Sequence, residues 1–393
     1  MANHKVYIEK NDNAYSGIIN LLKKIELPDL SKKKILIKPN LGRLVESGTG
    51  VITNTEAIEG MIDFFQNHNC KNLFIGDSPI IGLKIADIYQ KTGIRKLAEK
   101  KNVTLLDFDH DKPATIGIPA GIAINNLKVY NKLREFEFLV SFPVIKTHMH
   151  TTVSLSLKNL KGCLWRNEKV RLHQLTECGN PEILHKPLDM AIADMSLAIR
   201  PDLAIIDGSI ALEGLGPAAG SPKKTGVFIG SCNYLFADAV AARLMGFDPM
   251  KIAHLKLAFD RNNVSLENII IEPTDYMKYK IDLMPAPDKI SINFPNIKIK
   301  DNQSCSACLS TLLVFLKSYA PHIKYQTQKD GCVTIRIGKG DTDSDDSDIL
   351  LGNCSRKFQK PGNIFINGCP PISSNFFRIL KERGLIDGEY IQR

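Results

Sequence analysis

The sequence predicts an α/β fold, with a mostly parallel sheet and crossover helices, followed by a smaller C-terminal α/β domain. Short β-branched runs alternate with amphipathic stretches through the first half of the 393-residue chain, which is typical of parallel strands joined by helices. Polar residues gather where the predicted strands end, and open α/β sheets bind ligands at that edge. The periodicity fades across a stretch with several prolines at 273–287, so we expect domains at 1–275 and 276–393.

The elements of the first domain follow from these patterns in chain order. Aliphatic and β-branched runs predict strands, each closed by a polar or glycine-containing turn. Helices are expected where apolar residues recur at helical spacing, and the longest of them is interrupted at Thr92-Gly93. The strands are predicted at 35–37, 72–75, 103–108, 137–142 and 203–206, and the helices at 54–65, 85–100, 187–199 and 238–245.

The second domain shows the same alternation on a smaller scale. If its strands are neighbours in a parallel sheet, the residues that follow them meet at one edge of that sheet. A site built from several separate strand ends is therefore expected here. The strands are predicted at 290–299, 333–337, 349–351 and 364–366, and the helices at 309–319 and 376–382.

Composition narrows the class of function. The formal net charge is +9, but lysines and arginines are spread along the chain and aromatic residues make up only 7%, so a nucleic-acid partner is not expected. The basic excess favours an anionic substrate. No apolar run reaches the roughly 18 residues that span a bilayer, and the N-terminus lacks a secretory signal. We therefore expect a cytoplasmic protein without a membrane partner; the sequence leaves the oligomeric state open.

Nine cysteines in a chain without an export signal favour ligand roles over disulfides. Cys305 and Cys308 form a CxxC pair at a predicted helix start, where backbone N–H groups favour thiolates. Cys354 and Cys369 each follow a predicted strand, and Cys369 stands between a glycine and a proline. The four thiolates complete the ligand set of one [4Fe-4S] cluster. Structural zinc and plain burial are the alternatives, and Cys332 is the candidate substitute for Cys354.

A lysine–histidine segment follows the fourth predicted strand. It contains Lys146, His148 and His150, and the two histidines share a face if the backbone is extended, so they are candidates for anion binding, proton transfer or metal binding. Lys158 and Lys161 follow on a predicted helix and add positive charge. The segment suits a substrate that carries a carboxylate or a phosphate; an exposed basic turn is the alternative.

Acidic residues and a glycine-rich loop follow the strand predicted at 203–206. Asp207 and Glu213 are candidate acid–base groups or metal ligands, and turn formation is the alternative. The segment 213–220 lacks the Lys-Ser/Thr ending of a P-loop and the following helix of a dinucleotide fingerprint. Binding of ATP or NAD is therefore not expected.

Several motifs occur in a fixed order along the chain: Lys38-Pro39-Asn40, Gly76-Asp77-Ser78, Lys146-Thr147-His148, Lys158-Asn159-Leu160-Lys161-Gly162, Asp207-Gly208, and Glu213 with Gly216-Pro217. Their order resembles that of the domain of unknown function 362 family, over roughly 34–258. Many members carry an iron–sulfur cluster or a ferredoxin-like extension, and the resemblance implies a cluster in the C-terminal third here. This chain has no CxxCxxC run, so a two-cluster relay is not implied. Within the motifs, the residues expected to bind substrate or cofactor are Lys38, Asn40, Lys158, Asn159 and Lys161.

These residues together predict an iron–sulfur-dependent oxidoreductase or Lewis-acid enzyme that acts on a small anionic substrate at the interface of the two domains. Lys146, His148 and His150 are expected to bind the anion or move protons, with Asp207 or Glu213 as a base or metal ligand. An electron donor or acceptor protein is a candidate partner. The alternatives are a non-enzymatic electron-transfer or cluster-handling protein, and a histidine-centred metal enzyme with structural zinc.

Overall fold

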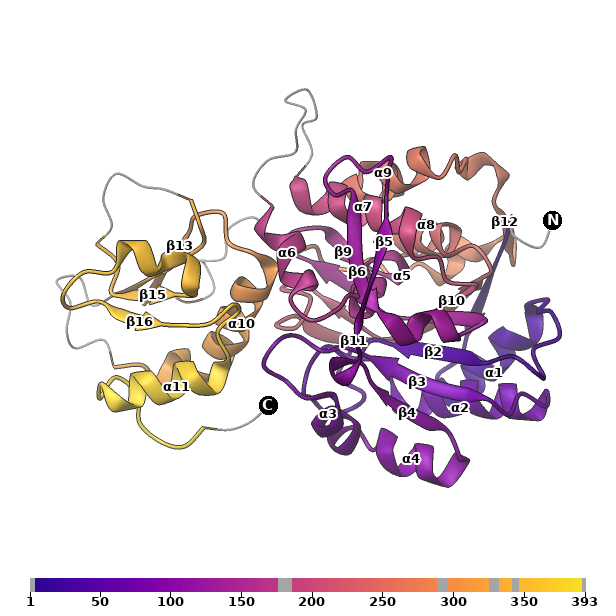
Figure 1. The fold of residues 1–393 in the computed structure, drawn as a ribbon, viewed down its shortest axis with the longest axis horizontal. Coiled ribbons are helices and arrows are strands. Elements are labelled where there is room, and N and C mark those ends of the chain that lie inside the picture. The colour runs from indigo at the N-terminus through magenta and orange to yellow at the C-terminus, as the bar shows by residue number, and fades with distance from the viewer. Residues whose placement is uncertain are drawn as a thin grey trace. The chain divides into compact units, whose positions relative to one another are not determined.

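The computed structural model describes residues 4–175, 186–287, 294, 296–324, 332–340 and 346–390. The chain divides into two compact units, Met1–Pro285 and Ala286–Arg393, whose elements are labelled in Figure 1. The boundary follows Pro285, whereas the boundary expected from the sequence follows residue 275. Each unit has a separate sheet.

A mostly parallel sheet forms the centre of the N-terminal unit. In spatial order its strands are β12 (Ile270–Glu272), β1 (Lys5–Lys10), β11 (Ser221–Ser231), β10 (Leu203–Glu213), β7 (Phe138–Phe142), β2 (Ile35–Pro39), β3 (Leu73–Asp77) and β4 (Thr104–Asp107). The strands from β10 to β4 run parallel, whereas β11 pairs antiparallel with β10 and β1. Parallel neighbours need crossover connections, and helices supply most of them here.

Helices cover both faces of this sheet (Figure 1). Side chains alternate along a strand, so Ile205 of β10 packs in one hydrophobic core and Ile206 in the other. The predicted α/β fold class is thus confirmed. One core contains α1 (Ala14–Lys24), α2 (Thr55–Asn67), α3 (Ile85–Lys91) and α4 (Ile94–Lys101); the other contains α5 (Ser156–Asn159), α6 (Glu168–Gln174), α7 (Pro187–Ala198), α8 (Tyr234–Leu244) and α9 (Ala253–Arg261).

Short polar side chains and one glycine determine where several of these helices begin. The side-chain oxygens of Asn13, Asn54 and Asn233 accept from N–H groups in the first turns of α1, α2 and α8, which is the usual role of an N-cap residue. The expected interruption at Thr92-Gly93 separates α3 from α4, and Gly93 has a left-handed φ of 79°. Such a φ favours glycine because it has no Cβ.

The segment after β7 differs from the polar loop that the sequence predicts. Val144–His148 forms strand β8, which pairs with β10 and, antiparallel, with β9 (Thr152–Ser154). Strand β10 also continues to Glu213, so Asp207 lies inside a strand. Neighbouring strands supply hydrogen-bond partners to this polar backbone, and a local pattern does not reveal such pairing.

The C-terminal unit has a parallel sheet in the order β13 (Ile297–Asp301), β14 (Val333–Ile337), β15 (Ile349–Leu351) and β16 (Ile364–Ile366). Helices α10 (Ser306–Tyr319) and α11 (Ser373–Glu382) pack together, with the rings of Phe315 and Phe376 stacked at 4.0 Å. Strands β14, β15 and β16 have the bounds that the sequence predicts. Of the strand expected at 290–299, residues 290–293 and 295 lie outside the described part.

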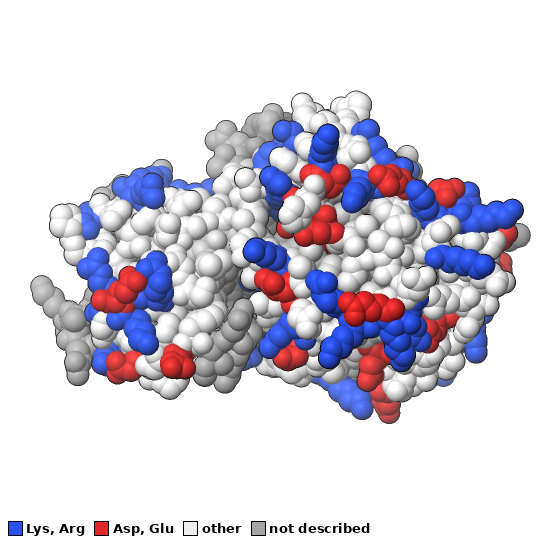
Figure 2. Space-filling model, turned by 60° about the horizontal axis from the view of Figure 1, so that its bottom comes forward, with Lys and Arg blue, Asp and Glu red and all other residues white. Residues whose placement is uncertain are grey.

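Figure 2 shows one face of the molecule, on which lysine and arginine side chains are interspersed with aspartate and glutamate. This face has no single basic tract of the kind that nucleic-acid-binding surfaces present. In the part of the chain that the structure describes, no helix combines the length and the apolar character needed to cross a membrane.

Candidate functional site

A buried ion pair joins the carboxyl ends of β2 and β3. Lys38 Nζ lies 2.7 Å from Asp77 Oδ1, and the two side chains are 1% and 2% exposed. The backbone N–H groups of Leu41 and Ser78 also donate to the Asp77 carboxylate, at 2.6 and 2.9 Å. A buried charge is tolerated when it is both paired and hydrogen-bonded, and both conditions are met here. The pair therefore fixes the loops that leave β2 and β3.

Asn159 attaches helix α5 to this ion pair. Its Oδ1 accepts from Lys38 Nζ at 3.0 Å and from Asn40 Nδ2 at 3.3 Å, and its Nδ2 donates to the Lys38 carbonyl at 3.1 Å. Gly162 lies against the pair: a Cβ there would be 1.9 Å from Asp77 Oδ1 and 2.6 Å from Lys38 Nζ. Three motifs of the sequence thus meet at one place, and lack of space requires the glycine.

The start of α5 is held by a carboxylate from another helix. Asp238 of α8 is fully buried, and its two oxygens accept from the N–H groups of Ser156 and Leu157 at 2.7 and 2.8 Å. Burial raises the pKa of Asp238 to about 7, while these hydrogen bonds oppose the rise. The carboxylate satisfies N–H groups that lack a partner inside the helix. Helix α5 is therefore fixed at its first turn by Asp238 and at its last residue by Asn159.

Lys146 of β8 lies in the same region without a carboxylate partner among the described residues. It is 4% exposed, and its Nζ donates to Asn40 Oδ1 at 2.7 Å and to the Val51 carbonyl oxygen. Burial lowers the pKa of Lys146 to about 7, and the charge of Arg43 adds to this effect. A lysine with such a pKa exchanges its proton near neutral pH.

Lys158, Lys161 and His173 extend the positively charged region. Lys161 Nζ is hydrogen-bonded to His173 Nε2. Lys158 is partly exposed and makes no hydrogen bond or ion pair with a described residue. Burial, and then the charges of Lys161 and Lys146, lower the pKa of Lys158 well below its ordinary value, whereas Asp189 raises it. We define the lysine–histidine group as Lys146, His148, Lys158, Lys161 and His173.

His148 is held as a neutral imidazole. Its Nδ1 accepts hydrogen bonds from the backbone N–H groups of His150 and Thr151, at 3.1 and 3.3 Å. A backbone N–H only donates, so Nδ1 carries no proton and the ring hydrogen is on Nε2. Burial, followed by the charge of Lys158, lowers the pKa of His148 well below its ordinary value. His148 thus presents a neutral Nε2–H donor, which differs from the proton-transferring role expected from the sequence.

Asp207 and Glu213 make no hydrogen bond or ion pair with the lysine–histidine group in the described structure. Asp207 is fully buried. Its carboxylate accepts from the backbone N–H of Asn54 at 2.8 Å and from the N–H two residues after Asp207 at 2.9 Å. Burial raises the pKa of Asp207. Glu213 accepts from the Met284 N–H at 3.0 Å and lies 3.6 Å from Lys223 Nζ. Both carboxylates therefore hold backbone around the site.

Residues outside the predicted set also belong to this region. The charge of Arg43 helps to lower the pKa of Lys146, and burial lowers the pKa of Arg43 itself to about 10. Lys169 donates to the carbonyl oxygens of Ser78 and the next residue, at 3.2 and 2.7 Å, and burial lowers the pKa of Lys169 to about 8. Neither position stands in a motif, so only the fold identifies them. The motif around Asp77 was the signal that could have identified that residue as the partner of a lysine.

The C-terminal unit brings its CxxC pair and two strand-end cysteines to one edge of its sheet. Cys305 is the N-cap residue of α10, Cys354 follows β15 and Cys369 follows β16. A hydrogen bond with Cys305 raises the pKa of Cys308 most, followed by burial and by the nearby thiols of Cys369 and Cys354. The thiols of Cys305, Cys354 and Cys369 therefore all lie near that of Cys308.

Glycines leave room for the backbone around these thiols. Gly352 has a left-handed φ of 87°, and a Cβ there would lie 3.3 Å from Cys308 Sγ. Gly368 has a φ of 135°, and a Cβ there would lie 2.5 Å from Pro371 Cα. Cys332 precedes β14, at the opposite, amino ends of the parallel strands. Among the described residues, no three histidine, cysteine or acidic side chains are arranged to hold a single metal ion.

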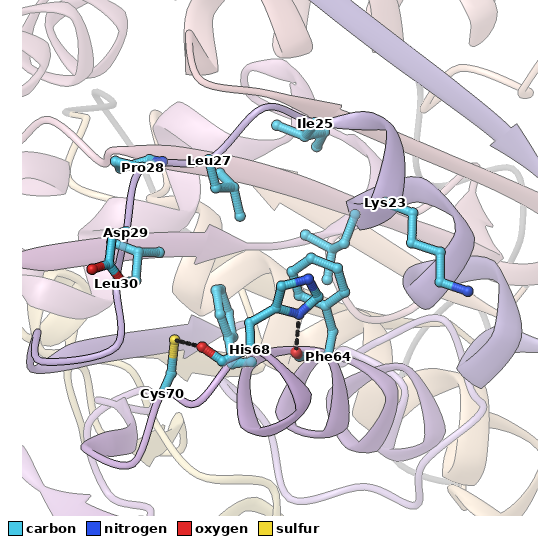
Figure 3. Close-up of a pocket in the computed structure, with 11 residues that line it drawn as sticks. Lys23, Ile25, Leu27, Pro28, Asp29, Leu30, Phe64, His68 and Cys70 are labelled. Carbon is cyan, nitrogen blue, oxygen red and sulfur yellow. Dashed lines mark hydrogen bonds between the residues drawn. The ribbon is translucent and has the colours of Figure 1, made fainter.

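A cavity of about 320 Å³ is lined by residues of α1, of α2 and of the loops that precede β2 and β3 (Figure 3), and none of its lining residues belongs to the lysine–histidine group. Its wall includes Ile25, Leu27 and Phe64, and is mainly apolar. His68 Nδ1 is hydrogen-bonded to the Phe64 carbonyl at 2.7 Å, and Cys70 Sγ donates to the His68 carbonyl at 3.7 Å. Backbone carbonyl groups thus already bond to His68 Nδ1 and Cys70 Sγ, as the dashed lines in Figure 3 show.

Known proteins are similar to parts of this chain. Residues 35–243 match the family described as Domain of unknown function (DUF362). Thylakoid-associated protein sll1697 of Synechocystis sp. is 27% identical over 219 residues, which are 56% of this chain and 65%, or less than two thirds, of that protein. The lactate racemase apoprotein from Thermoanaerobacterium thermosaccharolyticum aligns in structure with a TM-score of 0.40 and 15% identity, over 84% of this chain and 68% of that one.

Gly162→Ala is expected to destabilise the protein because the new methyl group occupies the space of the Asp77 carboxylate. Breaking a buried ion pair costs about 3–5 kcal/mol, so we expect a loss of that order in the free energy of unfolding, measured by urea denaturation. Gly117→Ala is the matched control, since a Cβ at Gly117 has no atom within 4 Å. Equal stabilities of the two variants would show that the ion pair does not depend on Gly162.

His148 is expected to stay neutral, with its hydrogen on Nε2, from about pH 5 to 8. The reason is that two backbone N–H groups donate to Nδ1 while burial opposes a charge on the ring. Nitrogen chemical shifts of ¹⁵N-labelled histidine measure both properties, and the His148→Gln variant identifies the signals. A ring that titrates in this range, or one that carries its hydrogen on Nδ1, would contradict the assignment.

Proposed function

This chain belongs to the DUF362 family, and since that description carries no activity, we propose a function from the chain's own residues. The N-terminal unit binds a small anionic substrate at the lysine–histidine group. The C-terminal cysteines hold one [4Fe-4S] cluster, and the protein is an enzyme of the oxidoreductase or Lewis-acid type. It works in the cytoplasm, where a reducing environment keeps the thiols available as ligands.

The observation that carries the substrate proposal is buried positive charge without matching negative charge. Lys38 is neutralised by its carboxylate partner, but the acceptors of Lys146 are an amide and a carbonyl oxygen. Lys158 has no hydrogen-bond or ion-pair partner in the described part of the chain. Burying charge in this way is costly, and such sites are functional candidates because a ligand offsets the cost. A carboxylate or phosphate group supplies the missing charge.

Each residue of the group then has a defined role toward the anion. Lys146 and Lys161 attract and bind it, the amine of Lys158 lies beside them, and Lys146 also exchanges a proton near neutral pH. His148 donates its Nε2–H to an oxygen atom of the substrate. A divalent metal at His148 and His150 is disfavoured, because neighbouring lysine charges repel cations and Nδ1 of His148 is already occupied. Asp207 and Glu213 support the backbone in this proposal and do not act as bases.

We assign the four cysteines of the C-terminal unit to one iron–sulfur cluster because a CxxC pair and two strand-end cysteines supply one thiolate for each iron. Each iron of a [4Fe-4S] cluster takes one thiolate, so the four thiolates stand farther apart than they do around one ion. The thiols of Cys354 and Cys369 lie near enough to Cys308 to raise its pKa, and Gly352 leaves backbone room beside Cys308. When bound, such a cluster supplies one-electron transfer or a Lewis-acidic iron. The proposed ligands are Cys305, Cys308, Cys354 and Cys369.

A non-enzymatic electron carrier is the second candidate, because the grouping of the cysteines alone favours it. Either function, if redox-active, requires a donor or acceptor protein as a partner. The two candidates differ at the N-terminal unit: an electron carrier needs no anion site, whereas the proposed enzyme depends on one. Anion binding is therefore the experiment that separates them.

Sulfate is a suitable test anion because it remains a dianion across the pH range of interest. Its affinity, measured by isothermal titration calorimetry, is expected to fall as the pH rises through about 7, where Lys146 loses its proton. Above that pKa the charged fraction of Lys146 falls about tenfold per pH unit. Lys146→Gln should lower the affinity about tenfold at pH values below about 7 and should remove most of the pH dependence.

Lys96→Gln is the matched control for this measurement. Lys96 is an exposed lysine of α4, so its replacement changes the net charge equally without touching the site. We expect wild-type affinity and wild-type pH dependence for this control. If Lys146→Gln binds sulfate as the control does, or if the wild type does not bind sulfate at all, the proposed anion site is wrong.

Anaerobic purification followed by iron, sulfide and zinc analysis tests the proposed cluster. We expect about four iron and four sulfide atoms per chain, and an electron paramagnetic resonance signal after reduction. Cys354→Ser should lose most of the iron, whereas Cys332→Ser, at the opposite end of the strands, should retain it. Zinc without sulfide would show that the cysteines hold a structural metal and not a cluster. Loss of iron from Cys332→Ser, with iron retained in Cys354→Ser, would overturn the ligand set.

A further inference from the structure

Lys158 differs from the other lysines of its surroundings in having no hydrogen-bond or ion-pair partner among the described residues. Lys38 has a carboxylate at 2.7 Å, and Lys146 donates to two oxygen atoms. Lys161 is hydrogen-bonded to His173. Lys158 makes no hydrogen bond or ion pair with any residue that the structure describes, and it is partly exposed. The structure thus leaves the amine of Lys158 without a bonding partner among the described residues, on a side chain that is only partly exposed.

The backbone at Lys158 is held in place although its amine has no bonding partner in the described part of the chain. Helix α5 is held at its start by Asp238 and at its end by Asn159, so the side chain projects from a rigid base. Burial and the charges of Lys161 and Lys146 lower the pKa of Lys158, whereas Asp189 of α7 raises it. Desolvation and neighbouring cations are the conditions that activate catalytic lysines, because the neutral amine is the nucleophile.

We propose that Lys158 is a nucleophile that forms an imine with a small 2-oxo acid held at the lysine–histidine group. The inference rests on the proposed anion site, since the carboxylate of such a compound is bound there by Lys146 and Lys161. A compound that carries both a carboxylate and a carbonyl group uses the cations and the amine together. A carboxylate alone would leave the amine of Lys158 without a role, and a carbonyl alone would leave the neighbouring cations without one.

The step is balanced without an oxidant or a reductant. The Nζ lone pair of Lys158 attacks the carbonyl carbon, and the carbonyl oxygen becomes a hydroxyl group. The C–O bond then breaks as the C=N bond forms, and the oxygen leaves as water with the two hydrogens of the amine. The Nε2–H of His148 is the neutral donor available to the oxygen during attack. The resulting imine withdraws electrons from the neighbouring carbon, which favours reactions at that carbon.

Reductive trapping tests this inference on the purified full-length protein. Pyruvate is the probe, sodium cyanoborohydride reduces any imine, and peptide mapping by mass spectrometry locates the adduct. We expect one adduct per chain at Lys158, formed at least about tenfold faster than at the exposed Lys96. Excess sulfate should slow its formation by competing for the carboxylate site. An adduct spread evenly over exposed lysines, or no adduct at Lys158, would overturn the inference.

Lys158→Arg distinguishes the amine from the charge. Arginine keeps a positive charge at the position but has no amine that forms an imine under these conditions, so the adduct should disappear while the far-ultraviolet circular dichroism stays that of the wild type. Lys96→Gln should keep the adduct. If the wild type binds sulfate but forms no adduct, the imine is wrong and the anion site stands. If sulfate neither binds nor slows trapping, the anion site itself has failed.

Discussion

The buried Lys38–Asp77 ion pair is the interaction on which the rest of the N-terminal unit depends. It ties together the ends of two neighbouring parallel strands, and through Asn159 it also holds helix α5. Gly162 exists as glycine because the carboxylate occupies the space that a side chain would need. A charge pair removed from water keeps its geometry strictly, since any displacement leaves a charge uncompensated. The loops that follow β2 and β3, and helix α5, are therefore held in fixed positions by this pair.

Three buried acidic residues of the unit bond to the unit's own groups, whereas the proposed anion site consists of lysines and histidines. Asp77 neutralises a lysine. Asp207 and Asp238 accept hydrogen bonds from backbone N–H groups at the starts of α2 and α5. Lys146 and Lys158 are left without a carboxylate in the described structure. For the proposed anion site, this arrangement means that the free protein gives up stability in favour of binding, which is the usual opposition between stability and function.

Several features could be predicted from the sequence because they depend on local pattern. The strands β14, β15 and β16 have the predicted bounds. Once they are taken as neighbours in a parallel sheet, the residues that follow them lie at one edge, so the gathering of Cys354 and Cys369 was foreseeable. The roles of Asp207 and His148 were not. The first depends on which backbone N–H groups lie opposite a carboxylate in three dimensions, and the second on two N–H groups that fix a tautomer. Arg43 and Lys169 belong to no sequence motif, so only the fold shows that they lie near the site.

Helix α5 has four residues and would not exist in isolation, since helices shorter than about 12 residues are marginal in water. It persists because both of its ends are bonded to buried side chains. The consequence for the proposed reaction concerns the entropy of association: the amine of Lys158 starts from a backbone that is already ordered, so the proposed ligand does not have to order a loop when it binds. Selection among ligands then depends on whether their charges match a fixed spacing, and a compound that is an ångström too long gains little from flexibility in the protein.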